Sequence, residues 1–180
     1  NVTLKNTLQL GGFNTYFFKK YKYPFESVLV NIVKKNKNKI KKINESYIKK
    51  ELSKLKFTKK NLERKKIDLK NYIKRYKKKE NQVAIFGTGH AACLFINLFE
   101  VKNLIDFAID DNLKKTGYFI PGSKIPIYNS KILQQKKIKL CLLGVSSDSE
   151  TKILKNHKSF TEKGNFFASI YPSSKYAIRA

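Results

Sequence analysis

The sequence has few of the residues that carry metal or redox chemistry. It contains no tryptophan and no methionine, and only two cysteines and two histidines among 180 residues. His90 and His157 are far apart, and Cys93 and Cys141 lie within apolar runs, so no ligand spacing typical of a metal site is present. We therefore expect no metal in this segment, and two reduced thiols buried in a core.

Long apolar runs are also missing. No stretch approaches the roughly 20 apolar residues of a membrane span, and the N-terminus has no signal-peptide pattern. Hydrophobic residues make up 41% of the chain, which is enough for a packed core. We expect a cytoplasmic protein without a membrane partner. Because the chain starts with Asn1 and lacks methionine, we also expect it to be part of a longer polypeptide.

Acidic residues and arginine are scarce. Lys and Arg number 39 against 13 Asp and Glu, a net charge of +26. Residues 1–82 hold 25 basic and 6 acidic residues (+19), and residues 83–180 hold 14 and 7 (+7). Three of the basic residues are Arg, the side chain that most often contacts phosphates and base edges. A solvated lysine surface without a nucleic-acid partner is our first interpretation. A basic nucleic-acid-binding protein, or a basic helix on an anionic membrane, is the alternative.

Residues 1–22 predict a β-hairpin at the end of an upstream domain. Two β-prone segments within residues 2–18 are separated by Gly11-Gly12, and both glycines tolerate positive φ. An isolated hairpin is marginally stable in water, so we expect its sheet to include strands that precede Asn1.

Residues 23–80 predict a helical connector. Pro24 stands where a first helical turn would begin, and helix is expected from Phe25 to Lys79. Asn44 and Thr58 are candidate N-caps, which favours two or three helices over one. Apolar residues recur at spacings of three, four and seven and form one stripe, which comprises Val28, Leu29, Ile32, Val33, Ile40, Ile43, Ile48, Leu52, Leu55, Leu62, Leu69, Ile73 and Tyr76.

Residues 81–180 predict a Rossmann-like α/β domain. Apolar strands alternate with helices, which indicates right-handed crossovers and a parallel sheet. The expected strands are 83–87, 104–109, 139–144 and 165–171. The expected helices are 91–99, a short one near 130–135, and 149–157.

A glycine-rich turn follows the first of these strands. Residues 87–92 read GTGHAA, a G-x-G-x-x-A pattern in which the glycines allow a tight turn and close approach of a phosphate. The helix that follows would offer free N–H groups to an anion. Asp110-Asp111 ends the second strand, where a carboxylate could accept hydrogen bonds from sugar hydroxyls. His90 either polarises a ligand oxygen or is an exposed loop residue. The alternative is a Rossmann-like domain whose glycine-rich turn binds no ligand.

Ser146, Ser147 and Asp148 follow the third strand, at the edge where open α/β sheets bind ligands. Ser147 or Asp148 could instead cap the next helix, and the two interpretations stay open. The sequence contains no Walker motif and no G-x-S-x-G motif, and we expect no catalytic residue in this segment.

The stretch DDNLKKTGYFIPGSKIPI, residues 110–127, resembles the D-x-N-P-x-K-x-G-x-x-x-P-G-T-x-I-P-I signature of a C-terminal domain. This domain belongs to the S-adenosylmethionine-dependent sugar C-methyltransferases, which branch nucleotide-linked deoxysugars. The turn at Val83–Gly89 lies at the family's spacing, and Asn97 matches an Asn in its first helix. Leu10-Gly11-Gly12-Phe13 is similar to the H-G-G-S hairpin that ends the family's methyltransferase domain.

The resemblance implies that this chain is the substrate-binding part of such an enzyme. S-adenosylmethionine and the catalytic residues would belong to an upstream methyltransferase domain of the same chain, and the ligand here would be a nucleotide-linked sugar. The residues expected to bind it are Gly87, Thr88, Gly89, His90, Asp110, Asp111, Asn112, Lys115, Pro121, Gly122, Ser146 and Ser147.

The chain departs from the family pattern in two places. Ala91 stands where the family usually has a basic residue in the glycine turn. Leu10, Phe13 and Thr15 replace the family's His, Ser and Arg in the hairpin, which suggests an altered sugar specificity or a relative that no longer methylates. A non-catalytic nucleotide- or NAD-binding module with the same fold is the alternative.

Overall fold

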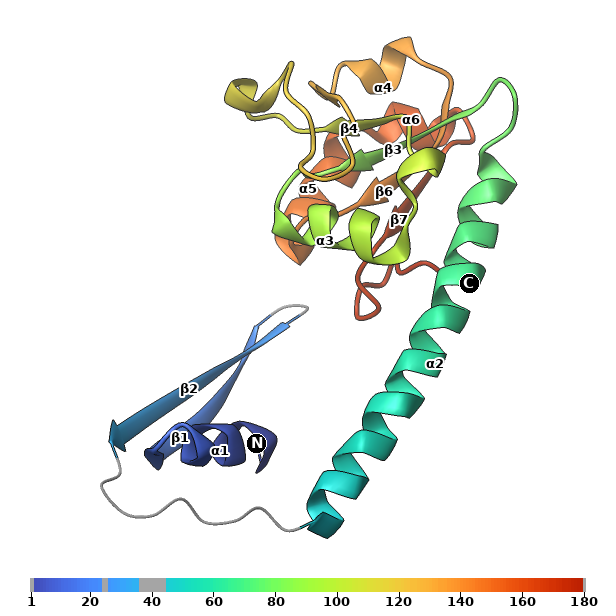
Figure 1. The fold of residues 1–180 in the computed structure, drawn as a ribbon. Helices are drawn as coiled ribbons and strands as arrows, with labels where there is room; N and C mark the ends of the chain where they lie inside the picture. The colour runs from blue at the N-terminus through green and yellow to red at the C-terminus, as the bar shows by residue number, and fades with distance from the viewer. Residues whose placement is uncertain (1, 24–25, 36–44, 180) are drawn as a thin grey trace. The chain divides into compact units, whose positions relative to one another are not determined.

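The computed structural model describes residues 2–23, 26–35 and 45–179 (Figure 1). The chain divides into two compact units, residues 1–61 and 62–180, which are described one at a time. Within the described ranges, no helix is long and apolar enough to cross a membrane.

Residues 62–180 are built on a parallel sheet, as the sequence predicts. Its five described strands lie in the order β5-β4-β3-β6-β7. They are β3 (Gln82–Phe86), β4 (Phe107–Ile109), β5 (Ile127–Tyr128), β6 (Ile138–Leu143) and β7 (Phe166–Ser169). Every neighbouring pair is parallel, so the Rossmann-like fold class is confirmed. The expected strand 104–109 is shorter at its start, because Lys102–Leu104 form a 3₁₀ turn, and β5 is an additional strand.

Helices cover both faces of this sheet. One core contains side chains of α3 (His90–Phe99) and of the second half of α2 (Glu45–Tyr76). The other core contains side chains of α4 (Ile132–Gln135), α5 (Ser147–Asn156) and α6 (Lys158–Glu162). The β3-to-β4 and β6-to-β7 crossovers therefore pass over opposite faces, as in a doubly wound sheet.

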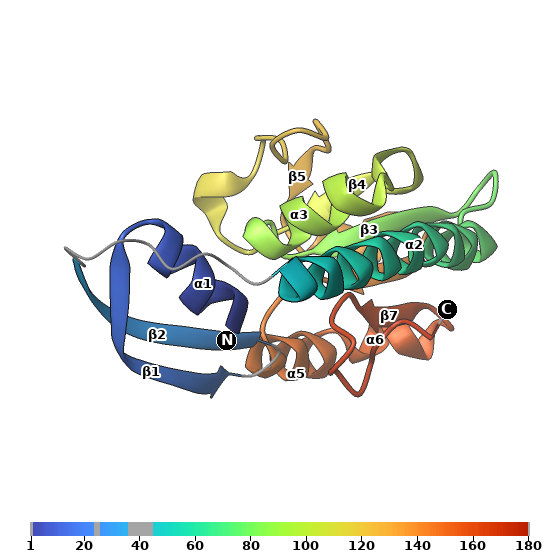
Figure 2. The same ribbon diagram turned by 60° about the horizontal axis from the view of Figure 1, so that its bottom comes forward.

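The second half of α2 packs directly on the sheet domain. Leu69 and Ile73 are buried in the same core as α3, and Lys66 and Lys70 donate hydrogen bonds of 2.7 and 3.1 Å to the Glu100 carboxylate at the end of α3. Figure 2 shows this part of α2 beside α3. Leu69 and Ile73 belong to the apolar stripe expected at Leu62, Leu69, Ile73 and Tyr76. Their burial, together with the two lysine hydrogen bonds, holds this part of α2 on the sheet domain.

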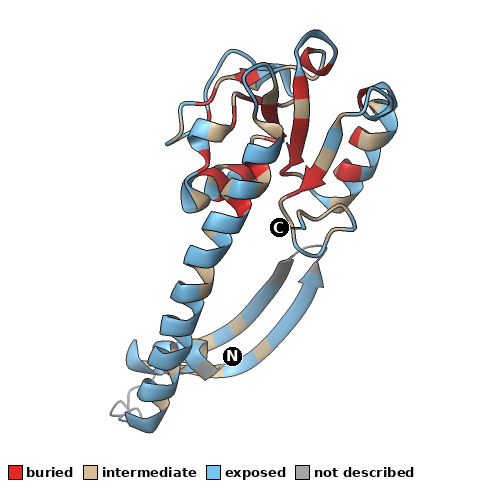
Figure 3. Ribbon diagram, turned by 90° about the vertical axis from the view of Figure 1, so that its right-hand side faces the viewer, coloured by how far each residue is buried: buried red, intermediate tan, exposed pale blue. Residues whose placement is uncertain are grey.

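Residues 1–61 contain α1 (Val2–Leu10), the hairpin β1 (Phe13–Tyr23) and β2 (Glu26–Lys35), and the first part of α2. β1 and β2 are antiparallel. α1 contacts α2 through the Thr3 hydroxyl, which donates to the Glu51 carboxylate (3.1 Å). Figure 3 shows the hairpin strands as exposed or partly buried, in contrast to the buried sheet of residues 62–180.

The predicted strand before Gly11-Gly12 is wrong, because Val2–Leu10 is a helix. The amides of Gly11 and Gly12 donate back to the carbonyls of Thr7 and Gln9, and Gly12 has φ +80°. Glycine is also common directly after the last residue of a helix. Gly11-Gly12 therefore end α1 and do not form the expected hairpin turn. An N-terminal hairpin is present, but it is formed by β1 and β2. Leu10 therefore ends a helix, and Phe13 and Thr15 lie in β1.

The predicted helix over the residues of β2 is also wrong. Val28, Leu29, Ile32 and Val33 satisfy a helical spacing, but they lie in a segment rich in β-branched residues that pairs with β1. Thr58 does not cap a helix, because α2 continues through this position. The Thr58 hydroxyl donates to the Lys54 carbonyl within the same helix. The expectations for Pro24, Phe25, Ile40, Ile43 and Asn44 fall outside the described residues.

Candidate functional site

The candidate site lies where the order of the sheet reverses. β3 and β6 are neighbours, and their crossovers leave over opposite faces. Open α/β sheets bind ligands in the crevice at the carboxyl ends of two such strands. The chain turns there at Gly87 after β3 and at Gly144 after β6, and the Gly144 amide donates to the Phe86 carbonyl (2.8 Å). The two turns therefore adjoin each other at the edge where a ligand is expected.

The two glycines of the first turn have different roles. Gly87 has φ +95°, and a Cβ there would lie 2.5 Å from Val145 Cγ1 and 2.9 Å from the Gly144 carbonyl oxygen. Gly89 has φ −77°, and a Cβ there would have no atom within 4 Å. Gly87 is therefore required for packing inside the protein. Gly89 leaves open space in front of the turn.

The N-terminus of α3 presents amides to this open space. Gly89 is the N-cap, and no side chain caps the helix. Since the first helical hydrogen bond runs from the Cys93 amide to the Gly89 carbonyl (3.1 Å), the amides of residues 90–92 have no acceptor within the helix. Such amides attract anions. A Cβ at Gly144 would lie 3.0 Å from the Cβ of Ala92, so the glycine at position 144 lets α3 pack this closely on the end of β6.

Asp110 fastens this turn to the end of β4. Its Oδ2 atom accepts hydrogen bonds from the Thr88 amide (3.2 Å), the Thr88 hydroxyl and Lys115 Nζ (2.8 Å), and its Oδ1 atom accepts from the Asn112 amide (3.0 Å). Burial alone would raise the pKa of Asp110, but the bonds from Lys115, Thr88 and Asn112 outweigh it and lower the pKa below its ordinary value. The carboxylate is therefore charged and already occupied by donors of the protein.

Lys115 brings a positive charge to a turn that contains none of its own. Its Nζ and the Thr88 amide share one oxygen of Asp110, so the two nitrogens lie within about 6 Å of each other, the sum of 2.8 and 3.2 Å. The side chain of Lys115 is 41% exposed and retains donors beyond the one bonded to Asp110. Because its charge is paired with that of Asp110, Lys115 offers hydrogen-bond donors near the turn more than an excess of positive charge.

The other residues of the 110–127 signature shape the loop that follows Asp110. Asn112 accepts from the Lys114 amide (3.1 Å) and starts a 3₁₀ turn at Leu113–Lys115. The Pro121 carbonyl accepts from Asn97 Nδ2 (3.3 Å), and a Cβ at Gly122, where φ is +78°, would lie 2.9 Å from Asn97 Oδ1. The signature therefore docks the loop onto α3, and Pro121 and Gly122 act through this packing.

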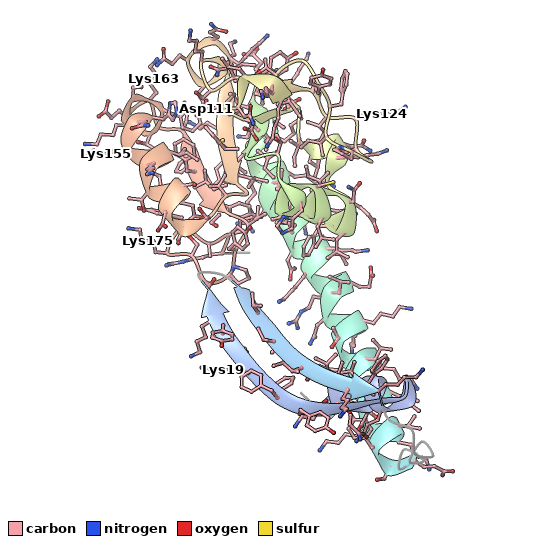
Figure 4. The ribbon with its side chains drawn as sticks, turned by 90° about the vertical axis from the view of Figure 1, so that its left-hand side faces the viewer. Lys19, Asp111, Lys124, Lys155, Lys163 and Lys175 are labelled. Carbon is pink, nitrogen blue, oxygen red and sulfur yellow. The ribbon has the colours of Figure 1, made fainter. Side chains whose placement is uncertain are left out.

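Three more of the predicted site residues, Asp111, Ser146 and His90, follow β4, β6 and β3 at the carboxyl edge of the sheet. Asp111 is exposed, and its carboxylate accepts a bond of 3.4 Å from the Ser130 amide. Figure 4 labels it together with four lysines of the same domain, Lys124, Lys155, Lys163 and Lys175. Ser146 caps α5 by accepting from the Ser149 amide (3.4 Å), so the cap lies one residue before the expected Ser147 or Asp148. His90 is exposed at the start of α3.

One buried acid was missed by sequence reasoning. Glu150 in the first turn of α5 is 3% exposed, and its Oε2 atom accepts from the Ser174 hydroxyl (2.7 Å). Its Oε1 atom has no donor among the described residues. An acid in a first helical turn reads from sequence as a favourable exposed charge, so the pattern gives no sign of burial. In the described part of the chain, no group of three or more His, Cys, Asp or Glu could hold a metal ion.

Comparison with protein families gives one assignment for this chain. The family model described as the C-methyltransferase C-terminal domain matches residues 27–172. The match includes β2, α2 and the sheet with its glycine turn. No curated protein matches the chain.

Proposed function

Because the chain belongs to the C-methyltransferase C-terminal domain family, we propose that residues 62–180 bind the nucleotide-linked sugar that such an enzyme methylates. The diphosphate lies on the Gly87–Gly89 turn, and the sugar extends toward the methyltransferase domain upstream in the same chain. The observation that carries this proposal is the open face of the turn. Gly89 leaves space where α3 begins with three amides that have no acceptor in the helix, and Lys115 Nζ lies within about 6 Å of the Thr88 amide.

The domain contributes binding and orientation. The amides and Lys115 hold the diphosphate, and the exposed Asp111 carboxylate is placed to accept hydrogen bonds from sugar hydroxyls. Fixing the diphosphate fixes the direction of the sugar and lowers the entropic part of the barrier to methyl transfer. S-adenosylmethionine, bound by another part of the protein, supplies the electrophilic methyl group.

The Asp110 carboxylate is not free to bind the ribose of an adenosine cofactor at this turn. In dinucleotide-binding domains, the acid at the end of the second strand accepts hydrogen bonds from the ribose hydroxyls. Here the Asp110 carboxylate already accepts four bonds from Thr88, Asn112 and Lys115. The exposed Asp111 carboxylate next to it stays available to a hydroxyl group, so titration with NAD separates a nucleotide-sugar site from a dinucleotide site. Tight NAD binding would instead favour the alternative of a non-catalytic NAD-binding module.

Calorimetry with thymidine, uridine, guanosine and cytidine diphosphates tests the proposal. We expect at least one of them to bind at millimolar concentration or below, and Gly89→Val to abolish that binding without unfolding the protein. Ser159→Val, an exposed position on α6, is the matched control and keeps the affinity. Absence of binding to both this chain and the full-length protein contradicts the proposal.

A further inference from the structure

A polar cavity lies at the C-terminal end of α3, whereas the glycine turn lies at the N-terminal end of the same helix. The volume of the cavity is about 440 Å³. It is lined by the polar residues Lys70, Asn97, Glu100, Lys102 and Asn103, and by Gly122. Because α3 has 10 residues, its two ends are about 15 Å apart. The cavity is therefore a separate place from the proposed diphosphate site.

One wall of the cavity is held by a charged network between α2 and α3. The Glu100 carboxylate accepts hydrogen bonds from Lys66 Nζ (2.7 Å) and Lys70 Nζ (3.1 Å). These bonds lower the pKa of Glu100 below its ordinary value, so the carboxylate is charged at neutral pH. The network fixes Lys70 and Glu100 relative to each other.

A second wall comes from the loop of the 110–127 signature. Asn97 Nδ2 donates to the Pro121 carbonyl (3.3 Å), and a Cβ at Gly122 would lie 2.9 Å from Asn97 Oδ1. The loop therefore approaches α3 closely at a position without a side chain. The backbone of Gly122 borders the cavity, so its shape is built into the fold.

The 3₁₀ turn after α3 brings donors that the protein itself does not use. Lys102 and Asn103 lie in the turn Lys102–Leu104, and both are exposed. Neither takes part in an ion pair or a side-chain hydrogen bond among the described residues. Lys70 has one bonded acceptor, and an ammonium group has three donors. The cavity thus offers two ammonium groups and one amide to a ligand, a donor set that suits a phosphate group.

Acceptors in the same cavity restrict the kind of anion. α3 ends at Phe99, and the last carbonyls of a helix have no amide partner within it. They carry the negative end of the helix dipole, and Glu100 adds a carboxylate. A phosphate with no further donors would meet these groups unfavourably. A ligand that also has hydroxyl groups donates hydrogen bonds to them.

The size of the cavity agrees with a small ligand of this kind. Sites for small molecules have volumes of roughly 300–1,000 Å³. The cavity, at about 440 Å³, lies in the lower part of this range and accommodates one sugar ring with a phosphate group.

We propose that this cavity binds a sugar phosphate, with its phosphate on Lys70 and Lys102 and its hydroxyl groups on Glu100 and the last carbonyls of α3. The inference goes beyond the proposed function, because the residues of the glycine turn do not line this cavity. The two ligands can therefore be bound at the same time.

An NMR titration of the full chain with glucose 1-phosphate tests the proposal. Inorganic phosphate and glucose probe the two parts of the ligand separately. We expect glucose 1-phosphate to shift the signals of Asn97, Asn103 and Gly122, and to bind more tightly than either part alone. Lys102→Ala should weaken this binding about tenfold, the usual effect of losing one hydrogen bond between charged groups. Lys155→Ala, an exposed lysine on α5 at the other face of the sheet, is the matched control and keeps the affinity.

Gly89→Val separates this proposal from the one on the glycine turn. The variant should lose diphosphate binding at the turn and keep the glucose 1-phosphate shifts at Asn103 and Gly122. The proposal is overturned if these signals do not move at millimolar ligand, or if inorganic phosphate or glucose alone binds as tightly as glucose 1-phosphate. It is also overturned if Lys102→Ala behaves like Lys155→Ala, or if the shifts appear at Gly89–Ala91 and not in the cavity.

Discussion

The Asp110 carboxylate accepts hydrogen bonds from both the amide and the hydroxyl of Thr88, so the end of β4 holds the turn that follows β3. The same oxygen accepts from Lys115 Nζ at 2.8 Å. An acid at this position of a Rossmann-like sheet is expected to contact the ligand. In this protein it positions the glycine turn and an ammonium group, the two features that we propose contact the ligand.

Replacement of Asp110 should reveal this structural role. We expect Asp110→Asn to lower the free energy of unfolding at pH 7 by about 1.5–3 kcal/mol, the usual contribution of hydrogen bonds to a charged group. Since the folded pKa of Asp110 lies below its ordinary value, its charge stabilises the fold above about pH 4, and this contribution is lost as the pH falls through the folded pKa. Urea unfolding at pH 7 and near pH 2.5 measures it. Asp111→Asn is the control, and an equal Asp110→Asn effect at both pH values contradicts the account.

The two glycines of the turn should respond differently to alanine. Gly87→Ala forces a Cβ into the Gly144 carbonyl at a positive φ, and we expect a loss of at least about 1–2 kcal/mol of stability. Gly89→Ala meets no atom and should change stability by less than about 0.5 kcal/mol. Thermal unfolding of both variants checks this. Equal losses of stability in the two variants would contradict the assignment of Gly87 to packing and of Gly89 to open space.

The second half of α2 should behave as part of the sheet domain. Ile73 is fully buried, so Ile73→Ala should cost about 2–5 kcal/mol. Ile67, on the same helix, is 61% exposed, and Ile67→Ala should have an effect below about 0.5 kcal/mol. Chemical denaturation of residues 62–180 compares the two variants. Similar stabilities would show that α2 does not pack on the sheet in solution.

The two thiols should differ in reactivity. Burial raises the pKa of the Cys141 thiol well above its ordinary value, so it has little thiolate at neutral pH and no access to reagent. Cys93 is only partly buried, so the expectation of a buried thiol is wrong for this residue. In a Cys93→Ser variant we expect no reaction with a disulfide reagent until denaturant is added, whereas Cys141→Ser should react in the native state. Rapid native labelling of Cys141 would refute its place in the core.

The sheet domain could be predicted because its strands are short apolar runs bounded by turn residues. The structure of the hairpin unit could not be predicted, because the apolar residues of Val28–Val33 fit both helical and strand spacing. The segment is a strand because it pairs with β1. Gly11-Gly12 fits either a hairpin turn or a helix end for the same reason.

The glycine turn and the 110–127 signature of the candidate site were found from sequence. Which of their residues pack inside the protein and which are open to a ligand could not be predicted. That Asp110 is occupied by Thr88 and Lys115 depends on three segments that meet in space. The burial of Glu150 under Ser174 likewise depends on a loop 24 residues away. Such contacts leave no local pattern.

We propose that the glycine turn of this C-methyltransferase domain receives a diphosphate, and an NMR titration of the backbone amides with uridine diphosphate follows each amide of the turn separately. We expect saturable shifts that are largest at Gly89, His90 and Ala91, together with a change at the Lys115 ammonium. The proposal is contradicted if these amides do not move at millimolar ligand, or if the shifts gather on the lysine-rich residues 45–61 instead.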